Sequence, residues 1–342
     1  MLRNIFKIAF RNLIKDRFYS LINILGLAIG ISASMLILLY ITDELSYDRF
    51  HKDSERIFRV ITKARMSEEE VMHIAVSSAP LADGLIKHIP EIETVTRISS
   101  GVIIFKFNEE VYKELNLYYA DSTFFDVFGF KLQKGNSSEV LRDPFSIVMT
   151  ENSAIRYFGE EALQNGSVVG QLIISGEDTY KVTGIVENVG HNSHFDFDIL
   201  VSMSTNPDAL SPIWLNMGYY TYVKLQKGTD PNQMNEKLRG LIIQYVVPQV
   251  VQYMHFPETN FTEDRVDDNF KFTLPPLEDI HLKSNLISEL GPNGDIQYIY
   301  IFTIISIFII LIACINFMNL STARSAKRAK EVGIRKTLGS DR

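Results

Sequence analysis

The residues with the most obvious chemistry are two histidines and two aspartates within one short polar segment. They are His191, His194, Asp196 and Asp198. Imidazole nitrogens and carboxylate oxygens are typical ligands of zinc. A polar turn that leads into a strand has the same composition, and no further cluster in the sequence supports a metal site. We therefore expect a turn here, with neither a metal nor a cofactor.

Motifs of the common catalytic classes are absent from the sequence. It contains no G-x-x-x-x-G-K-[ST] phosphate loop, no H-E-x-x-H zinc helix and no G-x-S-x-G nucleophile elbow. A membrane-tethered enzyme is therefore the weakest of the functions considered, and the chain is predicted to be non-catalytic.

The C-terminal segment, residues 324–342, carries a more distinctive pattern. A basic flank beside a membrane helix needs only lysine and arginine, but this segment also holds apolar residues and glycines around Glu331. The pattern consists of Glu331, Val332, Gly333, Ile334, Arg335, Lys336, Leu338 and Gly339. A basic flank alone does not explain it.

Two long apolar runs frame most of the chain. Residues 18–42 and 296–323 contain no Asp, Glu, Lys, Arg or His. Each exceeds the roughly 20 residues that a helix needs to cross a bilayer, and a core helix of a soluble protein usually shows a polar face. The first run is also longer than the apolar part of a signal peptide, about 7–15 residues. We expect two transmembrane helices, the first an uncleaved anchor.

Charge is distributed unevenly along the sequence. Residues 1–17 and 324–342 hold 12 of the 34 basic residues and only 3 of the 41 acidic ones, so the middle carries 22 basic and 38 acidic residues, a formal charge of −16. Basic flanks stay in the cytoplasm. We therefore expect a multi-pass protein of the cytoplasmic (inner) membrane with both ends inside and residues 43–295 outside. An acidic middle disfavours nucleic-acid binding.

The first 42 residues predict two kinds of contact in or at the bilayer. Apolar and basic residues alternate with helical spacing over residues 1–17, which favours an amphipathic helix on membrane lipids over a solvated helix packed on another protein. Gly26 and Gly30 lie four residues apart in the first apolar run, where small residues let a second helix approach closely.

The outer segment is predicted to be mixed α/β and, because the single cysteine is Cys314 in the second apolar run, to be free of disulfides. Thr150 is expected to cap a helix that stops at Gly159. Asp230 is expected to cap a second helix, which stops or kinks at Pro248. Strands are expected at 56–65, 92–98, 146–149, 180–186, 219–225 and 271–277, and a further helix at 80–88. We predict one subdomain from 43–126 and 215–295, interrupted by an inserted subdomain at 127–214.

Several segments resemble the MacB/FtsX-like permease family of ABC transporters. The tail at 331–339 is the most specific match, and the others extend the similarity over nearly the whole chain. They are ELSYDRFH at 44–51, RIFRV at 56–60, ADSTFFDVF at 120–128, YFG at 157–159 and NSHF at 192–195. The similarity is to long permeases of this family that have no fused ATPase.

The resemblance implies a Porter-like subdomain (43–126 and 215–295) with a Sabre-like insertion (127–214). It implies that residues 324–342 couple the permease to a separate ABC ATPase, which hydrolyses the ATP. It further implies a dimer or pseudo-dimer of permease halves, an extracytoplasmic adaptor as a further partner, and mechanotransmission that exports or releases a substrate. The family has four crossings per repeat, so we expect this chain to be the N-terminal part of a longer permease.

A two-helix transmembrane sensor receptor with an extracytoplasmic ligand-binding domain is the alternative. It predicts the same basic flanks, but it needs a signalling module after Arg342 in place of further crossings.

Overall fold

The computed structural model describes residues 17–65, 70–254, 261–262 and 265–338. The chain divides into two compact units, one formed by residues 1–45 and 295–342 and the other by residues 46–294. The predicted interfacial helix at 1–17 lies outside the described residues except for Arg17, the first residue of helix α2 (Arg17–Glu44).

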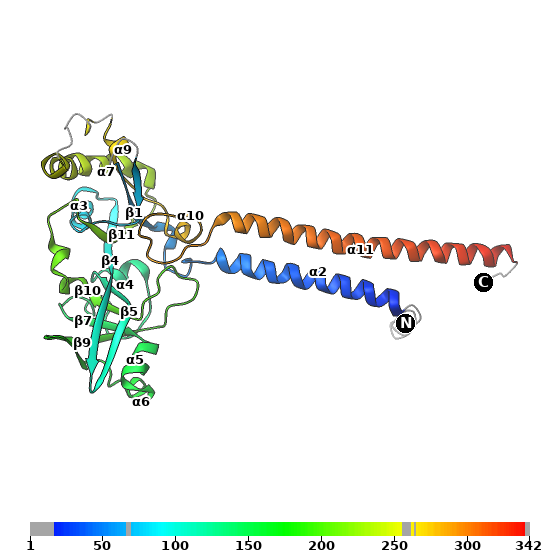
Figure 1. The fold of residues 1–342 in the computed structure, drawn as a ribbon, viewed down its shortest axis with the longest axis horizontal. Coiled ribbons are helices and arrows are strands. Elements are labelled where there is room, and N and C mark those ends of the chain that lie inside the picture. The colour runs from blue at the N-terminus through cyan, green and yellow to red at the C-terminus, as the bar shows by residue number, and fades with distance from the viewer. Residues whose placement is uncertain (1–16, 66–69, 255–260, 263–264, 339–342) are drawn as a thin grey trace. The chain divides into compact units, whose positions relative to one another are not determined.

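The first unit contains two long helices, α2 and α11 (Ile296–Thr337), which run side by side (Figure 1). Within them, Leu21–Glu44 and Ile296–Asn319 are each 24 residues long and apolar enough to cross a membrane. At 1.5 Å per residue, each of these spans measures about 36 Å, which exceeds the thickness of a hydrocarbon core. The expected pair of apolar helices is thus confirmed.

The small residues of α2 face α11. A Cβ added to Gly30 would lie 2.7 Å from Cβ of Ala313, and one added to Gly26 would lie 2.9 Å from Nδ2 of Asn316. Further along α2, the hydroxyl of Ser34 donates to the backbone carbonyl of Ser306 over 3.3 Å. Absence of side chains at the two glycines therefore permits the close approach of the helices.

Gly30→Leu is expected to separate α2 from α11, because carbon atoms pack no closer than about 3.5 Å. The measurement is bis-maleimide crosslinking between cysteines placed at Ser34 and Ser306, in a Cys314→Ser background. We expect a reduced yield in Gly30→Leu and an unchanged yield in Ile29→Leu, which alters a neighbouring exposed position. Equal yields in the two variants would contradict the packing.

In the second unit, twelve strands of the described residues form one mixed sheet. The order along its main path is β12-β1-β11-β4-β5-β10-β7-β9-β6, while β2 pairs with β1, β3 with β11, and β8 with β4 and β9. The strands are β1 (Ile57–Arg65), β2 (Val71–Ile74), β3 (Ser77–Ser78), β4 (Ile92–Phe107), β5 (Glu110–Ala120), β6 (Leu132–Lys134), β7 (Ser146–Thr150), β8 (Leu172–Ser175), β9 (Asp178–Val186), β10 (Ile199–Ser202), β11 (Met217–Leu225) and β12 (Phe270–Thr273).

Short helices cover parts of this sheet, and two of them, Leu81–His88 and Glu151–Phe158, begin and end close to the predicted positions. Thr150 caps α5 by accepting a hydrogen bond from the backbone N–H of Ser153, and Gly159 ends this helix with φ of 83°. The α-helices of the unit are α3 (Leu81–His88), α4 (Phe124–Phe128), α5 (Glu151–Phe158), α6 (Glu160–Asn165), α7 (Asn235–Leu241), α8 (Val247–Gln249), α9 (Val266–Asn269) and α10 (Ile280–Lys283). The predicted mixed α/β class is confirmed.

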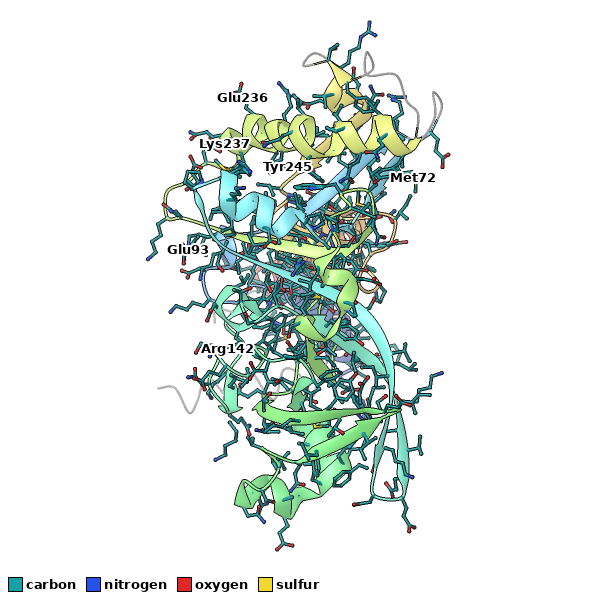
Figure 2. The ribbon with its side chains drawn as sticks, turned by 90° about the vertical axis from the view of Figure 1, so that its left-hand side faces the viewer. Met72, Glu93, Arg142, Glu236, Lys237 and Tyr245 are labelled. Carbon is teal, nitrogen blue, oxygen red and sulfur yellow. The ribbon has the colours of Figure 1, made fainter. Side chains whose placement is uncertain are left out.

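The helix that follows Asp230 does not stop at Pro248, while a kink there stays a prediction. Helical backbone continues through this proline, with π-helical turns at Ile242–Val246 and Val250–Met254 on either side of α8. A π turn bonds residues five apart, so the chain can accommodate a residue that lacks an N–H. Tyr245, labelled in Figure 2, stacks on Trp214 with ring centroids 4.8 Å apart and joins this helical layer to the core.

The sheet passes through both predicted subdomains. One hydrophobic core lies between α3, α7 and the strands around β1, and another lies between α5 and the strands around β7. The second core includes Ile103, Phe105 and Leu117, which come from the long β4–β5 hairpin rather than from residues 127–214. The division of the outer segment at 127 and 214 stays a prediction.

Candidate functional site

Asp48 anchors the turn that follows α2. Its carboxylate is fully buried, and its Oδ1 lies 2.8 Å from Nδ1 of His194 and 3.7 Å from Nε2 of His51. The same carboxylate accepts a hydrogen bond from the backbone N–H of His194, and the backbone N–H of Asp48 donates to the carbonyl of Asn192 over 2.9 Å. These contacts fasten the segment after the first apolar helix to the loop at 190–198.

A second set of buried polar groups continues from His194. Its Nε2 lies 2.8 Å from the hydroxyl of Tyr222 on β11. Arg59 of β1, which is completely buried, forms a two-pronged ion pair with Glu289 at 2.6 and 2.9 Å. Its guanidinium also donates to the hydroxyl of Ser284 over 2.7 Å. The segment that precedes α11 is therefore attached to an inner strand of the sheet.

Together these groups form a polar joint, defined as Asp48, His51, Arg59, His194, Tyr222, Ser284 and Glu289. Glu289 stands seven residues before α11 begins, and Asp48 four residues after α2 ends. The joint thus connects the chain segments next to both apolar helices with the adjacent strands β1 and β11. Buried, paired charges resist separation, because each charge left unpaired would carry a large desolvation cost.

The protonation states within the joint follow from burial and close partners. Burial acts to raise the pKa of Asp48, but contacts with His194 and His51 outweigh it and hold this pKa well below its usual value. Complete burial lowers the pKa of His194, although Asp48 acts in the opposite direction. Asp48 is therefore ionised and His194 neutral at neutral pH, with Nδ1 of His194 lying 2.8 Å from the carboxylate.

Acidification is expected to destabilise the outer domain through His194. A histidine in the unfolded chain has a pKa near 6.5, whereas the pKa of His194 in the folded protein is lower. The free energy of unfolding is therefore highest above about pH 6.5 and decreases as the pH falls below that value. We expect the thermal midpoint, followed by the fluorescence of Trp214, to fall between pH 7 and pH 5. His194→Asn can still donate to Asp48 without titrating, and this variant should show a smaller fall. An identical fall in both proteins would contradict the assignment.

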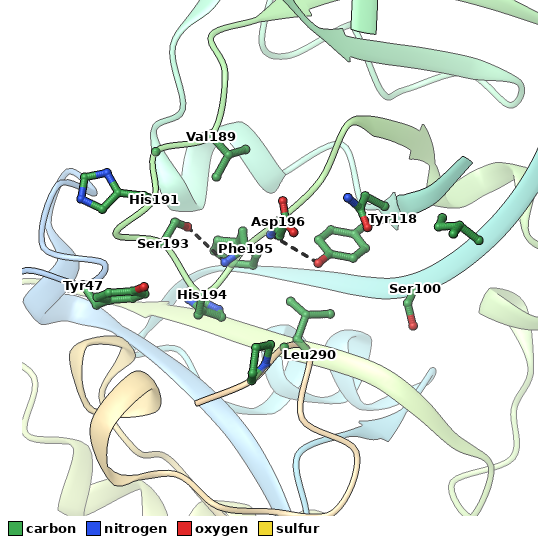
Figure 3. A pocket seen from close by; sticks show the side chains of 15 residues that line it. Tyr47, Ser100, Tyr118, Val189, His191, Ser193, His194, Phe195, Asp196 and Leu290 are labelled. Atoms are coloured by element: carbon green, nitrogen blue, oxygen red, sulfur yellow. Dashed lines mark hydrogen bonds between the residues drawn. The ribbon is translucent and has the colours of Figure 1, made fainter. Parts of the chain in front are cut away.

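The four residues considered as metal ligands are not brought together. His194 contacts Asp48, whereas His191 and Asp196 are exposed on the same loop, and Figure 3 shows the two histidines apart. In the part of the chain that the structure describes, no group of three or more His, Cys, Asp or Glu side chains could hold a metal ion. The sequence pattern at 190–198 thus serves the joint.

A cavity of about 570 Å³ lies beside this loop (Figure 3). Its walls combine aromatic and polar groups, with Tyr47 and Tyr118 among them and Leu290 from the segment before α11. Burial raises the pKa of Tyr118 to about 12, so its hydroxyl is neutral. It accepts a hydrogen bond from the backbone N–H of Asp196 over 3.4 Å. A cavity of this size and lining suits a mixed polar and apolar group.

The C-terminal pattern lies at the end of α11. The helix runs unbroken from Ile296 to Thr337, as the basic continuation of the apolar run predicts, and it contains Glu331, Gly333, Arg335 and Lys336. Val332, Ile334 and Leu338 are exposed, and Gly339 lies outside the described residues. At about 100° per residue, Ile334 and Leu338 lie on one side of the helical path and Val332 on the other.

Sequence reasoning missed most of the joint. The motifs at 44–51, 56–60 and 192–195 contain Asp48, Arg59 and His194, but nothing in the sequence shows that they meet. Tyr222 and Glu289 gave no signal of their own, because an isolated tyrosine in a strand and a glutamate in a loop are common.

The fold and the joint define a mixed α/β domain carried between two apolar helices. The sequence profile of the MacB-like periplasmic core domain matches residues 20–241, about two thirds of the chain. The chain belongs to this family. A periplasmic-type domain flanked by two membrane-length helices is the organisation of a membrane protein with an extracytoplasmic segment.

Comparison with solved structures found a similar fold at a TM-score above 0.5 and weaker likenesses below it. A domain of a protein named as a permease from Porphyromonas gingivalis is similar with a TM-score of 0.53 at 22% identity, over 66% of this chain and 91% of that one. The periplasmic region of MacB from Actinobacillus actinomycetemcomitans gives 0.45 at 16% identity, over 66% and 91% of the two chains. The extracellular domain of the noncanonic ABC-type transporter YknZ from Gram-positive bacteria gives 0.39 at 14%, over 64% and 99%. No curated protein sequence matches significantly.

Proposed function

We propose that this chain is the permease subunit of an ABC transporter, in which a separate ATPase drives movement of the extracytoplasmic domain. The polar joint is the observation that carries the proposal. Force applied along either apolar helix reaches Asp48 or Glu289 within a few residues, and the buried contacts of these groups pass it to β1 and β11. A domain that only bound a ligand would not need both chain ends fastened to the same inner strands.

The continuity of α11 supports the same function. Its 42 residues extend about 63 Å, so the apolar span and the basic tail form a single rod. Movement of the tail on an ATPase would therefore displace the outer end of the helix without a flexible link. Export or release of a substrate by mechanotransmission is the expected outcome, and no catalysis is required of this chain.

The tail supplies the coupling contact in this proposal. Glu331, Arg335 and Lys336 would pair with charges of the ATPase, while Ile334 and Leu338 would pack into a groove, as helical anchors do. Gly333 would allow close approach of the partner. Val332 and Gly339 complete the sequence signature.

We infer the membrane topology from the basic flanks, the acidic middle and the amphipathic pattern of residues 1–17, and the wider assembly from the family resemblance. Both ends lie in the cytoplasm, residues 43–295 lie outside the inner membrane, and residues 1–17 rest on membrane lipids. Two permease halves work as a dimer or pseudo-dimer, and an extracytoplasmic adaptor is a further partner.

A sensor receptor remains the second candidate, favoured by the cavity of about 570 Å³ in the outer domain. The two functions differ in their cytoplasmic partner. The test is affinity purification of the protein, at its natural full length, from its own membranes, followed by mass spectrometry. An ABC ATPase in stoichiometric amount supports the transporter. A signalling protein without an ATPase would overturn the proposal in favour of the receptor.

A further inference from the structure

The β4–β5 hairpin and β8 share one sheet face that lacks a covering layer among the described residues. Residues alternate along β4, with Ile103 and Phe105 buried and Val102 and Ile104 exposed. The buried set packs against the core that α5 covers. The other set points to the opposite side, because successive side chains of a strand alternate between faces.

The exposed set of this face is apolar. The pairing of the strands places several of these apolar residues opposite lysines, with Ile104 opposite Lys113 on β5, and Val111 and Ile174 both opposite Lys106. The apolar members are between 48% and 65% exposed, which is unusual for six large side chains on one surface. They are Val102, Ile104, Val111, Leu115, Leu172 and Ile174.

Positive charge is interleaved with these apolar groups. Lys106, Lys113 and Lys181 are exposed on the same face, the last opposite Leu172. Yet the segment between the two apolar helices carries a formal charge of −16. These lysines lie within an apolar surface of an acidic domain. They therefore favour a binding partner that carries carboxylates as well as apolar side chains.

The face continues into the large cavity. Leu115 belongs to the apolar set and also lines the cavity, together with Ser100 of β4 and Asn116 of β5. A flat apolar surface that ends in a hollow suits a protein partner, because binding energy concentrates where an anchoring side chain fills a pocket.

We propose that this face is the docking surface for an extracytoplasmic protein, through a segment that combines apolar side chains with carboxylates. A membrane surface fits less well, because the hairpin turns at the rim carry Glu109, Glu110, Glu177 and Asp178, which repel anionic headgroups. A second copy would bring the same three lysines to the contact. The inference rests on the proposed function in two respects only. The domain lies outside the cytoplasm, and an extracytoplasmic protein is available to bind it.

Photo-crosslinking tests the surface in the living cell. A benzophenone amino acid is placed at Val102 or Val111 of the full-length protein, and at Ile155 on α5 as the matched control on the other side of the same core. Each labelled protein is also made with one of two double substitutions. Ile104→Thr/Leu115→Thr removes apolar surface while it keeps strand propensity, and Lys106→Glu/Lys113→Glu reverses the charge of two lysines. Trp214 fluorescence checks that every variant is folded.

We expect Val102 and Val111 to crosslink to the same protein, at a segment with apolar and acidic side chains, and Ile155 to give no such product. Both double substitutions should lower the yield at least tenfold. A product with lipid, a product with a second copy of this chain, no product, or a yield indifferent to both double substitutions would each overturn the proposal. Co-purification of the ATPase is scored separately, so failure of the transporter assignment is distinguishable from failure of this surface.

Discussion

Arg59→Met is expected to lower the free energy of unfolding of the outer domain by about 3–5 kcal/mol. The substitution removes the guanidinium that pairs with both oxygens of Glu289 and with the hydroxyl of Ser284. Methionine fills much of the same volume, so the loss reflects charge rather than a cavity. What remains is a carboxylate that is only 12% exposed and has lost its cation. This loss is a large share of the total stability of a typical domain.

The double variant Arg59→Met/Glu289→Leu separates the two contributions. Removing both charges leaves no unpaired ion, and apolar replacements of a buried pair are often neutral in stability. We therefore expect the thermal midpoint, followed by Trp214 fluorescence of the full-length protein in detergent, to return most of the way to the wild-type value. If the single and double variants unfold at the same temperature, the loss of stability does not come from an unpaired buried charge, and this account of the ion pair is wrong.

The double variant also tests the mechanical role. It should fold and bind the ATPase, since neither residue is near the tail in sequence. If the joint transmits force, ATP hydrolysis in the assembled transporter should continue while transport falls. Wild-type transport in a stably folded double variant would show that the ion pair holds the fold together without carrying motion.

Ile334→Asp/Leu338→Asp is expected to remove the ATPase from the purified complex. Both side chains are exposed at the end of α11 and lie on one side of the helical path. A carboxylate in an apolar groove must be desolvated without a partner, which costs far more than the 1.4 kcal/mol that lowers affinity tenfold. We expect the amount of co-purified ATPase, measured by quantitative mass spectrometry, to fall at least tenfold.

Two controls locate the contact on α11. Ser321→Asp/Ser325→Asp adds the same charge to exposed positions before the pattern and should leave co-purification unchanged. Val332 lies on the opposite side of the helical path from Ile334, so Val332→Asp should lower co-purification less than the Ile334→Asp/Leu338→Asp pair.

Glu331→Lys should weaken binding of the ATPase by reversing a charge among basic neighbours. If Ile334→Asp/Leu338→Asp and Glu331→Lys both retain the ATPase, the tail is only a basic membrane flank.

Local patterns in the sequence determined much of this protein. The two charge-free runs predicted the apolar helices, because crossing a bilayer demands about 20 consecutive apolar residues. Thr150 and Gly159 predicted the ends of α5, because capping depends on backbone groups within a few residues. Local patterns also predict the strands β1, β7, β9 and β11. The motifs resembling the MacB/FtsX-like permeases pointed to the family whose core-domain profile matches the chain.

Tertiary structure alone decided which distant residues meet. Arg59 and Glu289 are 230 positions apart, and Asp48 and His194 are 146 apart. Their contacts depend on the path of the whole sheet, which no local pattern encodes. The same holds for the apolar face of β4, β5 and β8, because alternation along a strand predicts two faces but not which one another layer will cover. The sequence thus set the elements and their membrane context, while the packing of the sheet assembled the joint and left one apolar face without a covering layer among the described residues.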